Sequence, residues 1–255
     1  MNLKKLTAPL LLSLCLLAPV KAGAAGGSIT LPEYEWSFSG VFGKYDRPQL
    51  QRGFQVYKEV CSSCHGLTLK SYRNLSDLGY SDEEIKAFAS QFEVWDGPND
   101  DGDMFKRPAL PSDKFVPPFA NKNAARAANN GAYPPDMSLI IKARHDGANY
   151  LKALLMGYDP APEGFELPAG VSYNSYFPGH KIAMAQPLTD GQVTYTDGTP
   201  NTLDQMSSDV TAFLAWAAEP EMEERKQTGV RVMLFLIVLT GLLYLLKKRI
   251  WSDVH

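Results

Sequence analysis

Residues 230–246 form an apolar run that constrains the fold of this chain more than any other feature. The run is 17 residues long and carries one charge, Arg231, at its edge. This length reaches the lower limit for a helix that crosses a hydrocarbon core of about 30 Å. Three cations follow at residues 247–249, and Tyr244 and Trp251 are placed to anchor such a helix at an interface. We therefore expect a transmembrane helix whose basic end lies in the cytoplasm, rather than a buried helix of a soluble core.

The N-terminus has the layout of an export signal. Lys4 and Lys5 precede an apolar run over residues 6–20, and Ala-Gly-Ala at residues 22–24 forms a small-residue cleavage site. Cys15 lies inside the apolar run, so we interpret it as removed with the signal rather than kept as a lipid attachment point.

The middle of the chain has the composition of one ordinary globular domain. The 255 residues are 45% hydrophobic and 21% charged. The net charge is −3 and the cations form no cluster, so we expect no nucleic-acid partner. The sequence predicts a signal peptide at residues 1–24, an exported domain at 25–228, a transmembrane helix at 229–250 and a cytoplasmic tail at 251–255.

Residue patterns predict a mainly α-helical domain with long loops. Few runs alternate apolar and polar residues as strands do, and the chain contains 18 Pro and 20 Gly. One apolar helical stripe comprises Leu50, Phe54, Tyr57 and Cys61. Ser81 and Glu84 form a capping box for a second helix, to about Phe92. Further helices are expected over residues 121–130, 136–145, 150–158 and 203–218, with long loops over residues 105–119 and 159–202.

The helical stripe leads into Cys61-Ser62-Ser63-Cys64-His65, a C-x-x-C-H motif typical of covalent c-type haem attachment. On a helical turn the two thiols share a face, where each can add to a porphyrin vinyl group. The adjacent imidazole then serves as the proximal ligand of the iron. We therefore predict one haem c, with Cys61 and Cys64 as covalent attachments and His65 as an axial ligand.

Other uses of the two cysteines fit the sequence less well. A structural zinc site needs four ligands, and the exported chain keeps only two cysteines. A dithiol redox site favours a thioredoxin-like βαβ setting, which the pattern lacks, and a disulfide has no need of the neighbouring histidine.

A second strong ligand would close the iron for electron transfer. The candidates are Met104, Met137, Met156, Met184, Met206, His145 and His180. Met156 and Met206 lie at helical spacing among apolar residues, where a core role is the default. Met184 is favoured because it lies in a loop whose prolines restrict the backbone, and His180 and Met104 remain alternatives.

Several sequence strings together resemble the cytochrome c1 family, in order, from about Phe38 to Trp251. They are RGFQVY at residues 52–57, CSSCH at 61–65, DGPN at 96–99, AARAANNG at 124–131, PPD at 134–136, ARH at 143–145, DGTP at 197–200 and WAAEP at 216–220.

This resemblance implies a cytochrome c-like helical haem domain in the periplasm, held in a bacterial inner membrane by the C-terminal helix. It implies Met184 as the sixth ligand. It also implies that Arg144 lies near a haem propionate, with Tyr150 as a weaker propionate candidate and His145 as structural. Some bacterial members clamp the ligand loop with an extra disulfide, but this exported chain has no spare cysteine, so packing and prolines must hold its loop.

The resemblance further implies an electron-transfer subunit of ubiquinol–cytochrome c reductase, in a dimeric complex with cytochrome b. Its haem would take an electron from the Rieske iron–sulfur protein and pass it to a soluble c-type cytochrome. This chain breaks no substrate bond, since the quinol sites belong to cytochrome b. Two alternatives are a membrane-anchored cytochrome that serves another reductase or oxidase, and a five-coordinate haem enzyme or gas sensor.

An acidic cluster is a candidate docking surface for a basic cytochrome. It puts five carboxylates within eleven residues: Glu93, Asp96, Asp100, Asp101 and Asp103. A second group comprises Glu219, Glu221, Glu223 and Glu224. Either could steer a basic partner, and the alternative is a solvated charged face.

Overall fold

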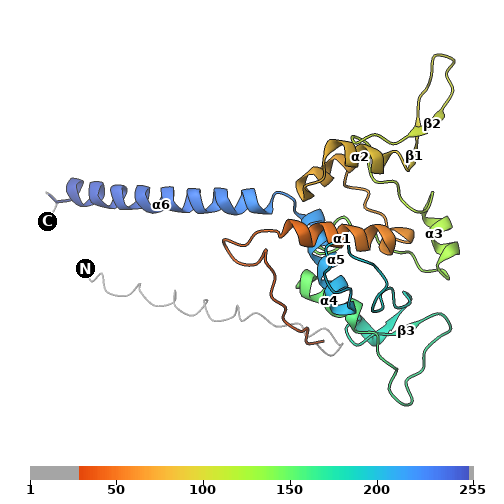
Figure 1. Ribbon diagram of the computed structural model, residues 1–255. Helices are drawn as coiled ribbons and strands as arrows, with labels where there is room; N and C mark the ends of the chain where they lie inside the picture. The colour runs from red at the N-terminus through yellow and green to blue at the C-terminus, as the bar shows by residue number, and fades with distance from the viewer. Residues whose placement is uncertain (1–28, 253–255) are drawn as a thin grey trace, which may run out of the picture.

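The computed structural model describes residues 29–252. The predicted signal peptide and the end of the predicted cytoplasmic tail lie outside these residues. The described chain is mainly helical, as predicted, and has one apolar C-terminal helix long enough to cross a membrane. Figure 1 shows that helix, α6 (Met222–Ile250), projecting away from a helical domain with long loops.

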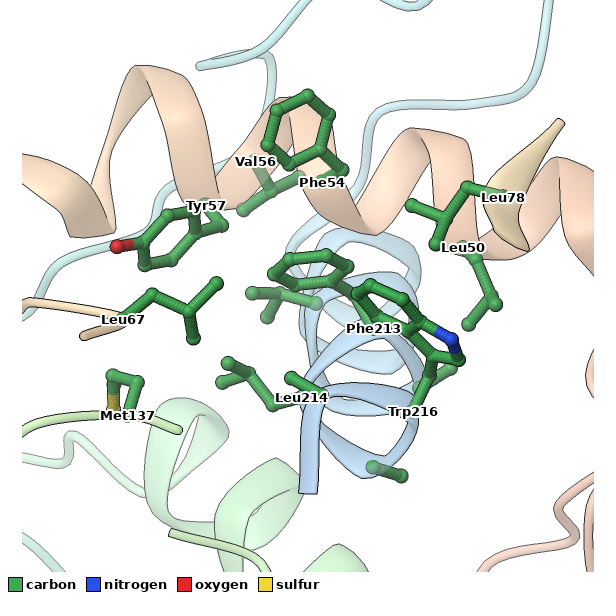
Figure 2. Close-up of a cluster of buried hydrophobic side chains, with 14 of the residues drawn as sticks. Leu50, Phe54, Val56, Tyr57, Leu67, Leu78, Met137, Phe213, Leu214 and Trp216 are labelled. Carbon is green, nitrogen blue, oxygen red and sulfur yellow. The ribbon is translucent and has the colours of Figure 1, made fainter. Parts of the chain in front are cut away.

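The domain is built around α1 (Arg47–Glu59) and α5 (Leu203–Ala218), which pack against each other. Their close approach depends on Gly53, where a Cβ atom would lie 2.0 Å from the backbone oxygen of Asp209. Phe213 and Trp216 of α5 extend toward α1 into the core drawn in Figure 2. Arg52 then closes this interface by donating to the fully buried Asp209 carboxylate at 2.9 Å.

Shorter elements surround this pair. They are η1 (Cys61–Ser63), η2 (Tyr72–Leu78), α2 (Asp82–Ala89), α3 (Lys122–Ala128), α4 (Gly147–Met156) and η3 (Pro178–His180). The predicted capping box opens α2, since Ser81 Oγ accepts from Glu84 N and the Glu84 carboxylate accepts from Ser81 N. The predicted helices at 121–130, 150–158 and 203–218 correspond to α3, α4 and α5, with ends displaced by up to three residues.

The helix predicted over residues 136–145 is wrong, because this segment is a series of turns. Several of its polar groups bond to the chain after His65, and its internal bonds form turns rather than a helical ladder. The Asp136 carboxylate accepts from Thr68 N at 2.9 Å and from Thr68 Oγ1 at 2.8 Å, and Met137 N donates to the Gly66 oxygen at 2.8 Å. Tertiary hydrogen bonds here outweigh the local helical pattern.

The loop predicted over residues 105–119 begins as a strand. β1 (Glu93–Asp96) pairs antiparallel with β2 (Phe105–Pro108), with Glu93 opposite Pro108. The other predicted loop, residues 159–202, contains the two-residue strands β3 (Ser172–Tyr173) and β4 (Lys181–Ile182), which also pair antiparallel. The first of these hairpins carries the acidic cluster, and the second precedes Met184.

Candidate haem site

The C-x-x-C-H motif lies on a tight turn at the end of α1. The helix ends at Glu59, and η1 then forms a 3₁₀ turn in which Cys64 N and His65 N both donate to the Cys61 oxygen, at 3.2 and 2.9 Å. Side chains three residues apart eclipse in a 3₁₀ turn, so the two sulfurs are directed to the same side. Both cysteines are free thiols, and burial raises the pKa of the Cys61 thiol to about 12. The two thiols are therefore not joined to each other and remain available for covalent attachment.

His65 is buried, with 8% of its surface exposed, and is oriented by two hydrogen bonds. Its Nδ1 lies 2.8 Å from the Pro135 oxygen, and its own backbone oxygen accepts from Tyr57 Oη at 3.1 Å. A carbonyl can only accept, so Nδ1 carries the proton and Nε2 keeps its lone pair. Burial lowers the pKa of His65, against the opposing effects of the Pro135 oxygen and the Asp136 charge. The neutral imidazole is then suited to bind a metal through Nε2.

Asp136 fixes the segment that supplies this carbonyl. Besides Thr68, its carboxylate accepts from Ser138 N at 2.9 Å. Ser138 Oγ accepts from Leu69 N at 3.1 Å. Burial raises the pKa of the Asp136 carboxyl, but the hydrogen bonds outweigh burial and leave the pKa lowered. Residues 135–138 and 66–69 are thus bonded into one support for the imidazole.

The predicted sixth ligand, Met184, follows β4 and is half-buried against the core. Its backbone oxygen accepts from Tyr158 Oη at 3.1 Å. Upstream, Asn174 is fully buried. Its side chain donates to the Leu154 oxygen at 2.8 Å and accepts from the backbone N–H groups of Tyr176 and Phe177. The Met184 loop is therefore held by side-chain hydrogen bonds as well as by packing, whereas the sequence indicated only packing and prolines.

The rival ligands have other environments. Met206 is fully buried in α5 and Met137 is 8% exposed in the core, whereas Met104 is 56% exposed beyond the β1 strand. His145 lies exposed in a turn. His180 stacks on Tyr173 with ring centroids 5.4 Å apart, and its Nδ1 lies 3.2 Å from the Asn174 oxygen.

The two propionate candidates lie together. Arg144 is exposed and lies near enough to Tyr150 for its charge to oppose the rise in phenol pKa caused by burial. Tyr150 in turn acts electrostatically on Tyr158, the residue that bonds to the Met184 oxygen. Tyr158 thus holds the Met184 backbone, and no sequence pattern pointed to it because an isolated tyrosine carries no motif.

The acidic cluster lies on the β1–β2 hairpin, but its five carboxylates differ. Glu93 accepts from Lys106 Nζ at 3.3 Å, and Asp96 forms an ion pair with Arg107. The other three, Asp100, Asp101 and Asp103, are exposed in the connecting loop, and no cation of the described chain pairs with them.

The donor set fits a covalently held haem: two free thiols three residues apart on one turn, and an adjacent buried imidazole whose Nδ1 is already hydrogen-bonded. Together with the helical domain and the apolar C-terminal helix, it is characteristic of membrane-anchored c-type cytochromes.

Comparison with known proteins agrees with this class. A family model described as "Cytochrome C1 family" matches residues 36–254. The chain belongs to the cytochrome c1 family, which comprises the electron-transfer haem subunits of the bc1 complex.

Its curated relatives include bacterial and mitochondrial proteins. It is 51% identical to cytochrome c1 of Rhodospirillum rubrum, over 91% of this chain and 92% of that one. It is 47% identical to the mitochondrial cytochrome c1 haem protein of Saccharomyces cerevisiae, over 91% of this chain and 75% of that one. It is 52% identical to a protein named cytochrome b/c1 from Bradyrhizobium diazoefficiens, over 92% of this chain, but spans only 37% of that longer relative.

Proposed function

We propose that this chain carries one haem c, bound through thioethers from Cys61 and Cys64 and ligated by His65 and Met184. In each thioether the thiol S–H adds across a vinyl double bond, so that no atom is lost. When bound, the haem would supply one-electron chemistry between the Rieske iron–sulfur protein as donor and a soluble c-type cytochrome as acceptor. The observation that carries the proposal is the His65 Nδ1 to Pro135 oxygen contact at 2.8 Å, next to two free thiols.

Residues of this chain hold the His65 imidazole in an orientation that would let it bind iron. The Pro135 carbonyl fixes the tautomer and ring orientation, and a hydrogen-bonded Nδ1–H makes Nε2 a better donor to iron. Since the carbonyl is held by Asp136 through Thr68 and Ser138, little reorganisation is needed when iron changes its charge.

On the opposite side, Met184 is the favoured thioether. Its backbone is held by Tyr158, it borders the core, and the loop before it is pinned by Asn174. A Met/His pair gives haem a relatively high reduction potential and leaves no open position for small ligands. Both properties suit a relay and argue against a five-coordinate haem enzyme.

Arg144 and Tyr150 are proposed to bind a haem propionate. The guanidinium would balance the carboxylate charge with charge-assisted hydrogen bonds, and the phenol already lies within hydrogen-bonding reach of that guanidinium.

We also propose that the chain works in ubiquinol–cytochrome c reductase, with cytochrome b and the Rieske protein, in a dimeric complex. The Bradyrhizobium relative supports the first partner, since its name joins b and c1 in one chain. In this proposal the complex oxidises quinol and this subunit only relays electrons. The haem domain would lie in the periplasm, anchored in the inner membrane by α6, whose last turn carries Lys247, Lys248 and Arg249.

Docking of the soluble cytochrome is proposed at the tip of the β1–β2 hairpin. Glu93 and Asp96 are neutralised by cations on β2, so the steering charge comes from Asp100, Asp101 and Asp103. Three exposed carboxylates without a cationic partner among the described residues can attract a basic protein surface at low salt.

Gentle detergent purification tests the assignment to the complex. The full chain, tagged after His255, should bring down a chain with b-type haem and an iron–sulfur protein, and added quinol should reduce its c-type haem. If the chain instead migrates alone and quinol leaves its haem oxidised, it serves another reductase or oxidase.

A further inference from the structure

The loop of residues 39–44, here called the interfacial loop, lies beside the beginning of α6 (Figure 1). It is fixed there by Lys226, whose Nζ donates to the Phe38 oxygen at 2.6 Å and to the Gly43 oxygen at 3.5 Å. Immediately after the loop, Tyr45 N donates to Glu223 Oε1 at 2.8 Å. The loop is therefore held against the helix from both of its ends.

The tip of the interfacial loop is apolar and exposed. Val41 is 62% exposed and Phe42 is 81% exposed, although apolar side chains of this size are stabilised by removal from water. Val41 lines a hollow together with Val230, Met233 and Leu234 of α6. Leu234 lies about 6 Å beyond Val230 along the helix axis, which matches the depth of about 5–10 Å to which interfacial anchors enter a membrane.

An adjoining hollow is cationic. It is lined by Lys44 and Arg231, for which no carboxylate partner occurs within residues 29–252, and by Lys226. Glu223 also lines it, but its carboxylate already accepts from Arg47 and from Tyr45 N.

The remaining charges nearby do not cancel these cations. Arg225 pairs with Glu219 at 2.5 Å, and Glu224 lines neither hollow. The cationic hollow and the apolar hollow share Val41, Lys226 and Val230, so a single molecule with an anionic end and an apolar chain can fill both.

We propose that these two hollows form a binding site for one phospholipid with a net negative headgroup. Lys44 and Arg231 bind the headgroup phosphate, one acyl chain lies along Val230, Met233 and Leu234, and Phe42 enters the same leaflet. A lipid is the occupant that the location favours, because the apolar run of the candidate membrane-spanning helix α6 begins at Val230, which lines both hollows. The site is independent of the proposed haem function.

A tryptophan in place of Phe42 tests the insertion. The full haem-loaded chain with its co-purifying subunits is reconstituted in nanodiscs of phosphatidylglycerol and phosphatidylcholine, with plain lipids or lipids brominated near the headgroup. The tryptophan fluorescence that Phe42→Trp adds to that of the parent chain should be quenched by the brominated lipids. A matched variant, Phe105→Trp on β2, should be unaffected. Equal fluorescence of Phe42→Trp in plain and brominated lipid would overturn the proposal, because the loop would then lie in water or beneath a protein partner.

Lipid retention tests the cations. Native mass spectrometry of the detergent-purified assembly should show one phosphatidylglycerol per chain, retained on the order of tenfold less well in Lys44→Gln/Arg231→Gln. The control Arg73→Gln/Lys86→Gln removes the same charge from η2 and α2 and should retain lipid as the parent does. Equal loss in both variants would reject the site. Displacement of the lipid by millimolar inorganic phosphate alone would also reject it, since it would indicate a free-phosphate site.

Discussion

At the scale of single residues, the proposed haem site rests on backbone groups that fix side chains. His65 receives its orientation from a carbonyl in a turn segment, and Met184 has its backbone held by a phenol. Neither partner is itself a ligand, yet each restricts where a ligand atom can lie.

Replacing the thioether should change the iron without unfolding the domain. In Met184→Leu we expect the reduction potential to fall by on the order of 100 mV, since axial ligation moves haem potentials over about 0.8 V. The reduced protein should also bind carbon monoxide. Redox titration and carbon monoxide difference spectra measure both effects, with Met104→Leu as a control at an exposed methionine. An unchanged potential and a closed iron in Met184→Leu would show that another residue is the ligand.

Replacing Asp136 should weaken the support of His65 in a pH-dependent way. Its pKa is lowered in the folded chain, so its contribution is present above the unfolded pKa of about 4 and is lost as pH falls through the lower folded pKa. We expect Asp136→Asn to lower the free energy of unfolding by about 1–3 kcal/mol at neutral pH and to reduce its dependence on pH below about 4.

Denaturant titrations from pH 3 to 7 check this, with the exposed Asp101→Asn as the control. If the Asp136 variant followed the control at every pH, the carboxylate would contribute nothing to the turn segment.

At the scale of elements, α1 and α5 hold the C-x-x-C-H turn in place, and the β1–β2 hairpin carries charge outward. The packing of α1 against α5 requires that residue 53 has no side chain. The negative charge of the hairpin comes from carboxylates that do not pair with its own cations. Each element therefore has its own test.

Adding one methyl group to α1 should separate the helix pair. In Gly53→Ala the new Cβ would lie 2.0 Å from the Asp209 oxygen and 2.7 Å from Phe213 Cβ. The backbones must move apart, so we expect a loss of about 1–3 kcal/mol or more in stability and a lower yield of haem-loaded protein. Thermal unfolding followed in the haem absorption measures this. Gly241→Ala, whose Cβ would meet nothing within 4 Å, should behave as the parent chain does.

Neutralising the hairpin tip should slow electron delivery to a basic cytochrome. In Asp100→Asn/Asp101→Asn/Asp103→Asn we expect the bimolecular rate to fall several-fold to about tenfold at low salt, with a weaker dependence on ionic strength. Stopped-flow mixing with a basic soluble cytochrome measures the rate. Glu83→Gln/Glu163→Gln/Glu166→Gln removes the same charge from exposed positions elsewhere. Equal slowing in both would make the effect one of net charge rather than of this hairpin.

At the scale of the whole molecule, strong local patterns predicted the architecture and tertiary contacts supplied the rest. The capping box at Ser81 and the apolar helices at α5 and α6 are visible in sequence because neighbours along the chain define them. The helical pattern at residues 136–145 was misleading, because Asp136 bonds to Thr68 far away in the chain and the segment forms turns. Hydrogen bonds between residues far apart in the chain produce no periodic pattern in the sequence.

The candidate site shows the same division. Cys61, Cys64 and His65 are predicted by one contiguous motif. Met184 was favoured by the prolines of its loop, and the family resemblance then placed it above His180 and Met104. Pro135 and Tyr158 could not be found in advance, since one acts through a backbone carbonyl and the other through a hydroxyl 26 residues from its acceptor.

The central claim is that Cys61 and Cys64 hold the haem covalently, and denaturing extraction of the purified chain tests it most directly. In acidified organic solvent the colour should stay with the polypeptide, the intact mass should include one haem, and neither thiol should react with an alkylating reagent. The peptide spanning residues 61–65 should carry the added mass. Colour that passes into the solvent, with both thiols open to alkylation, would contradict the account.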